Sequence, residues 1–259
     1  MAAVVRRDYH VARSYRLPFV LDLFYGVINL VVFFFISRTF GDTAADLDAA
    51  PDYFSFAAVG IALMIVLAAA STGLAARIRE EQLTGTLEAL VAQPLTTTEV
   101  ALGLAGFPFL FAIVRAGFYI LVAAAFMGLD ISETDWIGFA SVLLVAGVAL
   151  SGLGVLFGAL VLLVKRGEVL AGMVTTGMGL VSGAFFPVSV LPDWLEPLGA
   201  IMPTRFAFDG LRDAIFRGEG WGGDVLALTG FATLSLPLAI FVFHEALRHA
   251  RRTGSLGQY

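Results

Sequence analysis

Residues 80–94 read EEQLTGTLEALVAQP and separate two long apolar stretches of the chain. Glu80, Glu81 and Glu88 carry charges that are costly in hydrocarbon. This segment therefore lies in water, while the stretches on either side of it are apolar enough to cross a membrane. The quoted segment marks where the chain leaves the bilayer and where it returns.

The composition is that of an integral membrane protein. The chain has 259 residues, of which 59% are hydrophobic and 14% are charged, whereas soluble domains carry about 25% charged residues. The sequence contains no cysteine, which excludes disulfides and thiolate chemistry.

Six stretches are long and apolar enough to cross about 30 Å of hydrocarbon as helices. They are residues 18–39, 53–76, 100–127, 137–164, 169–190 and 225–243. We therefore predict an all-α integral membrane protein with six transmembrane helices, in which residues 1–259 form a single transmembrane domain. The first stretch is too long for the apolar core of a signal peptide, which indicates a retained anchor.

Charge divides the connecting segments into two sets. The N-terminus, residues 77–99, residues 165–168 and the tail (residues 244–259) together hold 11 basic residues, and the other set holds four basic and 13 acidic residues. Because Lys and Arg gather on the cytoplasmic side, both termini and residues 77–99 are predicted to be cytoplasmic. Residues 1–17 predict a helix lying in the membrane interface, with a basic flank that only sets topology as the alternative.

Catalytic chemistry finds little support in the sequence. Lys165 follows a valine, so the chain has no Gly-Lys pair and no phosphate-binding P-loop. His244 and His249 are five residues apart, whereas a helical zinc site needs a spacing of four. We expect no catalytic site, no metal and no cofactor in this chain, so any energy for transport comes from an ion gradient or another chain.

The cytoplasmic segment contains a short helix with one apolar face. Leu87, Leu90 and Val91 follow the helical spacing i, i+3, i+4, and Gly85 and Pro94 limit the helix to about two turns. An apolar helix face exposed to the cytosol indicates a helix that docks in a groove on a partner protein. A solvated connector is the alternative.

Two local patterns connect this segment to the spans on either side. Arg77 precedes Glu81 by four residues, so the two side chains can pair on a helix that continues from the second span. Thr96 and Glu99 form a capping box that starts the third span.

The segment of residues 191–224 is too polar to span a membrane, and we predict an amphipathic helix beside the outer leaflet from Thr204 onward. Its polar stripe offers two opposite-charge pairs at i, i+4, each worth some tenths of a kcal/mol. These residues are Arg205, Asp209, Asp213 and Arg217. The apolar side comprises Phe208, Leu211 and Ile215.

Three polar residues fall inside predicted spans. Arg115 lies near the middle of the third span, Asn29 lies within the first, and Asp22 lies near the cytoplasmic end of the first. A charge there is costly unless it is paired or wetted. Arg115 should therefore face the protein interior, a cavity or a dimer interface, and both a pathway role and a structural ion pair stay open.

Small residues recur at a spacing of four in the fourth and fifth spans, as Gly154 with Gly158 and Gly179 with Gly183. This spacing lets helices approach closely. In a chain with 28 glycines, ordinary packing within one chain is favoured over a dimerisation role.

Two series of residues resemble those of a known family. The first is Glu81, Gly85-Thr86-Leu87-Glu88, Leu90 and Pro94. The second is Ser182-Gly183-Ala184-Phe185-Phe186-Pro187, Leu191-Pro192-Asp193-Trp194-Leu195, Pro203-Thr204 and Leu211-Arg212. In this order, and in a chain without a P-loop, they are similar to the permeases of the ABC-2 type membrane family, which export drugs, lipids and polysaccharides. The chain departs from that family at Leu104, where a basic residue is expected soon after the third span begins.

The resemblance implies a coupling helix between spans two and three that seats in a separate ATPase chain, and short re-entrant helices between spans five and six that form an outer gate. The coupling residues would be Glu81, Gly85, Thr86, Leu87, Glu88, Leu90 and Val91. The gate residues would be Gly183, Pro187, Pro192, Trp194, Pro203 and Arg212. Two ATPase chains would bind ATP and Mg, and a second permease copy or a related chain would complete the pathway.

The function expected from this resemblance is ATP-driven export of a hydrophobic or amphipathic substrate, such as a drug, a lipid or a lipid-linked glycan. The expected location is the cell membrane of a prokaryote, in contact with lipids and with no nucleic-acid partner. One alternative is a carrier driven by an ion gradient, or a channel, which internal repeats and midplane ionisable residues would favour. A non-transport membrane scaffold is the other.

Overall fold

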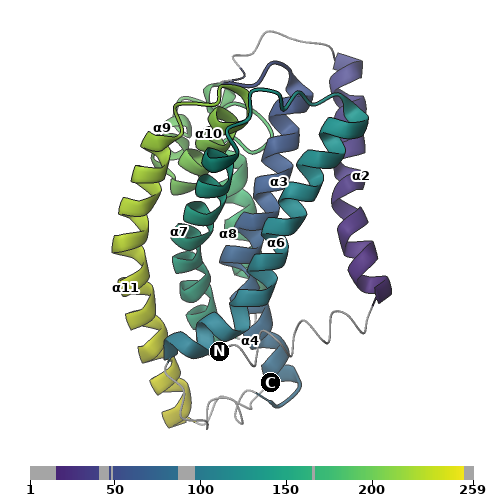
Figure 1. Ribbon diagram of the computed structural model, residues 1–259. Helices are drawn as coiled ribbons and strands as arrows, with labels where there is room; N and C mark the ends of the chain where they lie inside the picture. Colours follow the sequence, from purple (N-terminus) through teal and green to yellow (C-terminus); the bar gives the residue numbers. More distant parts are fainter. Residues whose placement is uncertain (1–15, 41–46, 48, 87–96, 165–166, 254–259) are drawn as a thin grey trace.

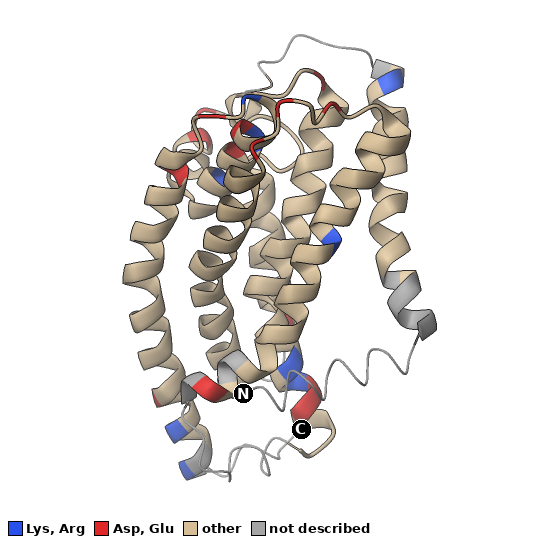
Figure 2. Ribbon diagram, in the orientation of Figure 1, with Lys and Arg blue, Asp and Glu red and all other residues tan. Residues whose placement is uncertain are grey.

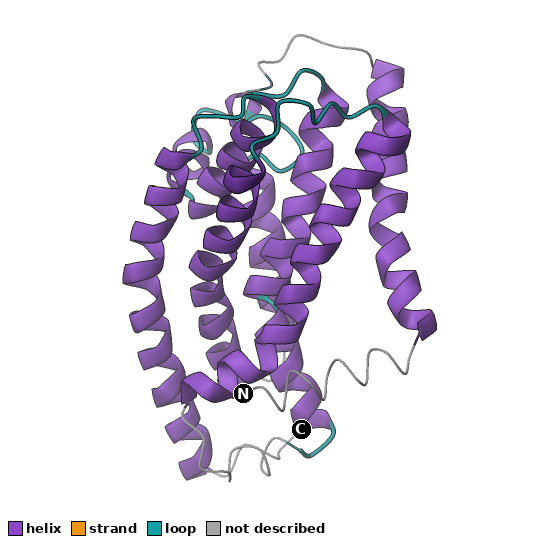
Figure 3. Cartoon of the chain, in the orientation of Figure 1, coloured by secondary structure: helices purple, strands orange, loops and turns teal. Residues whose placement is uncertain are grey.

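The computed structural model describes residues 16–40, 47, 49–86, 97–164 and 167–253. Every regular element within these residues is helical, and the long helices run side by side as a bundle (Figure 1, Figure 3). The predicted all-α fold is therefore confirmed. The elements are α2 (Arg16–Phe40), α3 (Tyr53–Ser71), α4 (Gly73–Leu83), α6 (Thr97–Met127), α7 (Trp136–Leu163), α8 (Gly167–Val181), η1 (Val188–Val190), α9 (Glu196–Ile201), α10 (Pro203–Phe216) and α11 (Gly222–Thr253).

Within the described residues, four helices are long and apolar enough to cross a membrane. They comprise Tyr53–Ser71, Gly103–Met127, Trp136–Leu163 and Gly222–Ala250. Two shorter apolar helices, Leu23–Thr39 and Gly167–Val181, coincide with the first and fifth predicted spans. The chain is thus a multi-pass membrane protein. The predicted interfacial helix lies almost wholly outside the described residues.

The second predicted span, residues 53–76, is divided into two helices. α3 ends at Ser71 and α4 begins at Gly73, with Thr72 between them. The hydroxyl groups of Ser71 and Thr72 each donate to the carbonyl oxygen four residues earlier, at 2.6 and 2.8 Å. Hydrogen bonds of this kind often bend helices. The second span is therefore interrupted at Thr72, although the amides of Thr72 and Ala76 keep their bonds to the carbonyl four residues earlier.

The fifth predicted span, residues 169–190, also ends early, because α8 stops at Val181. Gly183 has a φ of 93°, a left-handed conformation that glycine adopts without a steric penalty. The amides of Gly183 and Ala184 donate back into the last turn of α8, which are the two bonds of a Schellman motif. The residues after α8 therefore form a turn and a short 3-10 helix rather than the end of a span.

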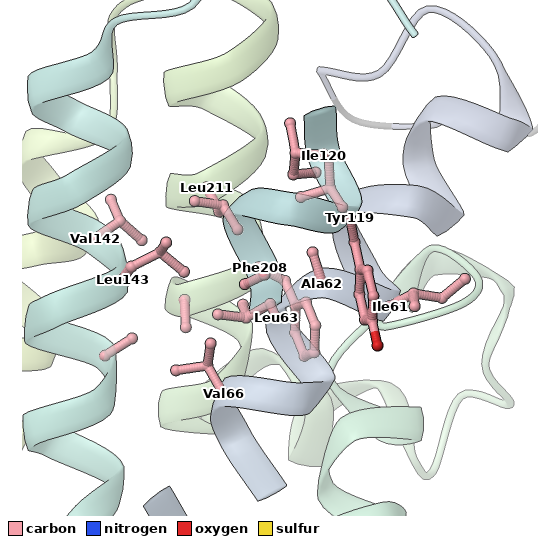
Figure 4. Close-up of a cluster of buried hydrophobic side chains, with 14 of the residues drawn as sticks. Ile61, Ala62, Leu63, Val66, Tyr119, Ile120, Val142, Leu143, Phe208 and Leu211 are labelled. Atoms are coloured by element: carbon pink, nitrogen blue, oxygen red, sulfur yellow. The ribbon is translucent and has the colours of Figure 1, made fainter. Parts of the chain in front are cut away.

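The main core lies where α10 packs against α3 and α7. Phe208 and Leu211 of α10 are fully buried in one cluster with Leu63 of α3, Ile120 of α6 and Leu143 of α7 (Figure 4). The apolar face predicted for this helix is therefore confirmed, but the prediction that it lies beside the outer leaflet was wrong, because this face is fully buried against the long helices.

The opposite face of α10 carries the two predicted ion pairs. Arg205 Nε lies 3.0 Å from Asp209 Oδ2, and Arg217 Nη1 lies 2.8 Å from Asp213 Oδ1. Both pairs join residues four apart in the helix, so the polar stripe read from the sequence is confirmed.

Close helix approaches depend on glycine. A Cβ atom at Gly154 of α7 would lie 2.1 Å from the carbonyl oxygen of Ala70, and one at Gly179 of α8 would lie 2.2 Å from Met64 Sδ. α7 and α8 therefore press onto α3 at positions where a side chain does not fit. The predicted role of these glycines in packing within one chain is confirmed.

The two ends of the bundle differ in charge (Figure 2). Asp130 and Asp135, in the connection between α6 and α7, lie at what we call the acidic end. The other end, which we call the basic end, is formed by α4, the start of α6 and the end of α11 and shows both basic and acidic bands. The cytoplasmic location of the basic end stays a prediction.

Candidate functional site

A cavity of about 810 Å³ lies between α2, α3 and α6, with α4 and α8 completing its wall. Its volume is within the roughly 300–1,000 Å³ typical of small-molecule sites. Most lining residues are apolar. The polar ones include Arg115, Asn29, Tyr25, Thr72 and Thr176. Two of the three intramembrane polar residues singled out in the sequence thus line the same cavity.

Arg115 is the only basic residue of α6, and Figure 2 shows a basic band midway along this helix. Its guanidinium carbon lies 5.7 Å from the ring centroid of Phe111 and 6.0 Å from that of Tyr119, within the range of cation–π attraction. The Tyr119 hydroxyl donates to the carbonyl oxygen of Leu23 at 2.9 Å. Arg115 is therefore held beside a ring that is itself fixed to α2.

α2 supplies the remaining polar wall of the cavity. The Asn29 amide donates to the carbonyl oxygen of Tyr25 at 3.1 Å. A Cβ atom at Gly26 would lie 2.1 Å from Tyr119 Cζ, so the absence of a side chain at Gly26 lets α2 and α6 meet. The side chain of Asp22 lies outside the described residues.

At the acidic end, Arg212 of α10 is fully buried. Its Nη2 atom donates to the carbonyl oxygen of Gly183 at 2.7 Å and to that of Phe56 at 3.4 Å. Its guanidinium carbon lies 3.4 Å from the centroid of the Phe56 ring. Two predicted gate residues, Gly183 and Arg212, are therefore joined directly, and they tie the turn after α8 to α3 and α10.

The other predicted gate residues divide between buried and exposed positions. Pro187 is buried before η1, and Pro203 stands at the first position of α10, where proline suits a helix start. Pro192 is exposed, and Trp194 is 78% exposed. The structure thus places Trp194 on the surface, away from the Arg212 contact.

Phe185 was not among the site residues predicted from the sequence. It lines the cavity, and its ring stacks on Phe33 of α2 with a centroid distance of 5.3 Å and an interplanar angle of 15°. The signal that could have found it is its position between Gly183 and Pro187, two residues that force a turn. Thr72 and Thr176 were also missed, because a lone threonine in an apolar helix carries no distinguishing pattern.

The predicted coupling segment begins at the end of α4. Gly85 has a φ of 71°, and the amides of Gly85 and Thr86 donate back into the last turn, as in a second Schellman motif. The Thr86 hydroxyl donates to the carboxylate of Glu81. The predicted helix break at Gly85 is confirmed. The remaining coupling residues, Leu87, Glu88, Leu90 and Val91, lie outside the described residues.

Charged contacts fix α4 at the basic end. Arg77 Nη1 pairs with Glu80 Oε2 at 2.7 Å, where we had predicted a pair with Glu81. Arg79 Nε lies 3.9 Å from Glu168 Oε1 of α8. Leu104, at the position where the family carries a basic residue, is 1% exposed in an apolar cluster with α4 and α7 residues. A charge would not be tolerated there, so Leu104 serves packing.

The fold and the cavity define a multi-pass helical membrane protein with a partly open cavity between α2, α3 and α6. The family model described as ABC-2 type transporter matches residues 2–216. The chain therefore belongs to the ABC-2 type transporter family, whose members are the membrane components of transporters. A search of curated proteins found no match.

Proposed function

We propose that this chain is the membrane-spanning permease of an ATP-driven exporter. The four long helices, together with α2 and α8, form six spans, and the basic end faces the cytoplasm. Two permease copies, or this chain and a related one, stand above two ATPase chains that bind ATP and Mg. The coupling helix, residues 85–91, seats in the ATPase chain, and the segment from Gly183 to Arg212 forms the outer gate as short re-entrant helices.

The observation that best supports this proposal is the position of α4. One end of α4 contributes Gly73 and Ala76 to the lining of the cavity, next to Thr72, and the other end leads through Glu81 into the predicted coupling segment. α4 has 11 residues, a rod of about 16 Å at 1.5 Å per residue. A displacement of the coupling segment is thereby passed to the cavity wall.

The surroundings of α4 suit such a movement. Leu74 and Ile78 are buried against Gly158 of α7, so α4 meets α7 at a position where α7 carries no side chain. The break at Thr72 separates α4 from α3, so α4 can tilt without rotating the whole span. In the proposed cycle, closure of the ATPase chains moves α4, and the substrate leaves the cytoplasm or the inner leaflet through the cavity.

Cross-linking tests the docking part of the proposal, because the chain has no cysteine of its own. Thr86→Cys places a thiol at an exposed position, and Glu219→Cys is the matched control at the acidic end. In purified permease–ATPase complexes, a thiol–amine reagent should join Thr86→Cys to a chain that mass spectrometry identifies as a P-loop ATPase. Equal cross-linking from both positions, or none from Thr86→Cys in an intact complex, would refute the docking site.

Transport measurements test coupling itself. The double variant Leu87→Asp, Glu88→Ala should retain expression and ATP hydrolysis in the complex but lose export, whereas Glu219→Ala, which removes a carboxylate at the acidic end, should transport normally. Normal export by the double variant would refute the coupling role. Transport driven by an ion gradient in vesicles that lack the ATPase would instead establish a carrier.

A further inference from the structure

We infer that a pocket at the acidic end binds the headgroup of a zwitterionic phospholipid of the phosphatidylethanolamine type, with the phosphate on Arg38 and the ammonium group on Asp52. The pocket has a volume of about 330 Å³ and lies where the end of α2, the start of α3 and the end of α6 meet. This inference goes beyond the proposed function, because it concerns a lipid held at the membrane surface rather than a transported substrate.

The position of the pocket along the helices places it at the level of lipid headgroups. Arg38 lies in the last turn of α2, and Figure 2 shows a basic band at this end of the helix. Met127 is the last residue of α6, and Asp52 directly precedes α3. An arginine near the end of a span extends its charged group toward the membrane interface. Arg38 can therefore meet the phosphate of a lipid in the surrounding bilayer.

Each of the two charged groups in the pocket is held by its own helix. The guanidinium carbon of Arg38 lies 4.5 Å from the centroid of the Phe34 ring, within the range of cation–π attraction. The Asp52 carboxylate accepts from the amide and from the hydroxyl of Ser55, both at 2.9 Å, and so caps α3. Among the residues that the structure describes, Arg38 forms no ion pair. Two opposite charges therefore line one pocket without closing on each other.

A ligand that carries both charges satisfies both groups. The planar guanidinium of Arg38 matches the oxygens of a phosphate, and the Ser37 hydroxyl, which also lines the pocket, can donate to the same phosphate. A primary ammonium group has three N–H donors for the Asp52 carboxylate. A choline group has no N–H to donate, and an anionic headgroup would meet repulsion from Asp52. The two charges together therefore favour phosphatidylethanolamine over phosphatidylcholine and phosphatidylglycerol.

Apolar side chains beside the pocket suit the acyl chains of such a lipid. Phe34 and Met127 line the pocket, and their sequence neighbours Phe35 and Phe126 are exposed apolar side chains on α2 and α6. The volume of the pocket is at the lower end of the roughly 300–1,000 Å³ typical of small-molecule sites. The pocket therefore holds the headgroup, while the acyl chains lie outside it along the exposed surface of these helices.

Native mass spectrometry tests this binding without ATP or a partner chain. The purified permease, delipidated in a mild detergent, is mixed with equal concentrations of phosphatidylethanolamine, phosphatidylcholine and phosphatidylglycerol that have identical acyl chains. We expect one retained phosphatidylethanolamine, preferred about ten-fold over each of the other two lipids, which corresponds to about 1.4 kcal/mol.

Four variants assign the binding to this pocket. Arg38→Gln should lower the retention of phosphatidylethanolamine about ten-fold, and Arg38→Lys should restore part of it. Asp52→Asn removes the charge but still caps α3, so phosphatidylglycerol should then be retained as well as phosphatidylethanolamine. Ser37→Phe fills the pocket and leaves both charges in place, so it should abolish the preference.

Arg217→Gln is the matched control, because Arg217 is an exposed arginine at the same end and does not line this pocket. It should retain phosphatidylethanolamine as the parent protein does, and all variants should elute as the parent does. Loss of the preference in Asp52→Asn and in Ser37→Phe, with Arg217→Gln unchanged, supports the inference.

Three outcomes would overturn the inference. They are equal retention of the three lipids by the parent protein, a preference for either of the other two lipids, and a preference for phosphatidylethanolamine that survives Asp52→Asn or Ser37→Phe. Because neither an ATPase nor transport is involved, these results are independent of the docking test at Thr86.

Discussion

Arg212 should be a main determinant of the stability of the acidic end, and Arg212→Met tests this directly. Methionine keeps much of the unbranched apolar stem and removes the guanidinium. The wild-type guanidinium donates to the Gly183 carbonyl at 2.7 Å and stacks 3.4 Å above the Phe56 ring, with no exposed surface. The substitution therefore removes a buried charge and leaves the Gly183 carbonyl without its donor.

The size of the effect follows from these contacts. A hydrogen bond to a charged group contributes about 1.5–3 kcal/mol, and a desolvated cation–π contact about 2 kcal/mol. Together these two contributions give an expected loss of about 3–5 kcal/mol. For a chain of this size, this loss corresponds to a fall in Tm of roughly 10 °C.

Arg217→Met is the matched control, because it makes the same substitution on the same helix. The side chain of Arg217 is 54% exposed and pairs with Asp213 at 2.8 Å, and exposed pairs contribute at most about 1 kcal/mol. Thermal unfolding of both variants in one detergent measures the difference. An Arg212→Met protein that melts no earlier than Arg217→Met would refute the assigned role.

A thiol probe adds a local measurement to the melting experiment. Ala184 is fully buried in the turn that Arg212 holds, and the chain has no other thiol. Ala184→Cys should react slowly with a maleimide in the parent background and much faster with Arg212→Met. Equal rates would show that Arg212 does not hold this turn.

Three further predictions concern the turns and the cavity. Gly85→Ala should destabilise the end of α4 by about 1 kcal/mol through its left-handed backbone alone, because nothing lies within 4 Å of the new Cβ. The control Gly172→Ala, which has open space in a helix, should stabilise the protein by about 0.5–1 kcal/mol. Equal Tm shifts for the two variants would contradict the left-handed turn at Gly85. Gly154→Ala places a Cβ 2.1 Å from a carbonyl oxygen of α3 and should cost about 3 kcal/mol, measured by Tm against the same Gly172→Ala control. Phe33→Ala and Phe185→Ala should show a coupling energy of about 1 kcal/mol in a double-mutant cycle, and additive effects on Tm would exclude their stack.

The sequence predicted features that depend on local patterns. Residues four apart in a helix are neighbours whatever the rest of the fold does, so the pairs of Arg205 with Asp209 and Arg217 with Asp213 were correctly predicted. The helix break at Gly85 was correct for the same reason, because glycine and the last turn of one helix suffice to form it. The apolar lengths of α6 and α7 likewise predicted these two spans closely.

Features formed by several helices together could not be predicted from the sequence. The cavity exists because α2, α3 and α6 meet at particular depths, and nothing in the sequence relates Asn29 to Arg115. The burial of Arg212 against Phe56 joins residues 156 positions apart. The break at Thr72 goes with hydroxyl hydrogen bonds from Ser71 and Thr72 to the carbonyl oxygens four residues earlier, which apolar length does not report. Leu104 was read only as a departure from a family pattern, whereas its neighbours explain it as a core residue.

The arrangement of rigid and short elements limits how the proposed transporter can move. The long helices and α10 share one buried core, so large shifts between them would break many contacts at once. The two ends of the cavity are instead formed by short elements beside helix breaks, with α4 after Thr72 at the basic end and Phe185 after Gly183 at the acidic end. α4 keeps buried contacts of its own through Leu74 and Ile78, so the helix break at Thr72, and not a lack of packing, is what distinguishes it from the long helices. Alternating exposure of Arg115 to the two sides therefore requires movement of α4 and of the Phe185 turn, while the walls between them stay fixed.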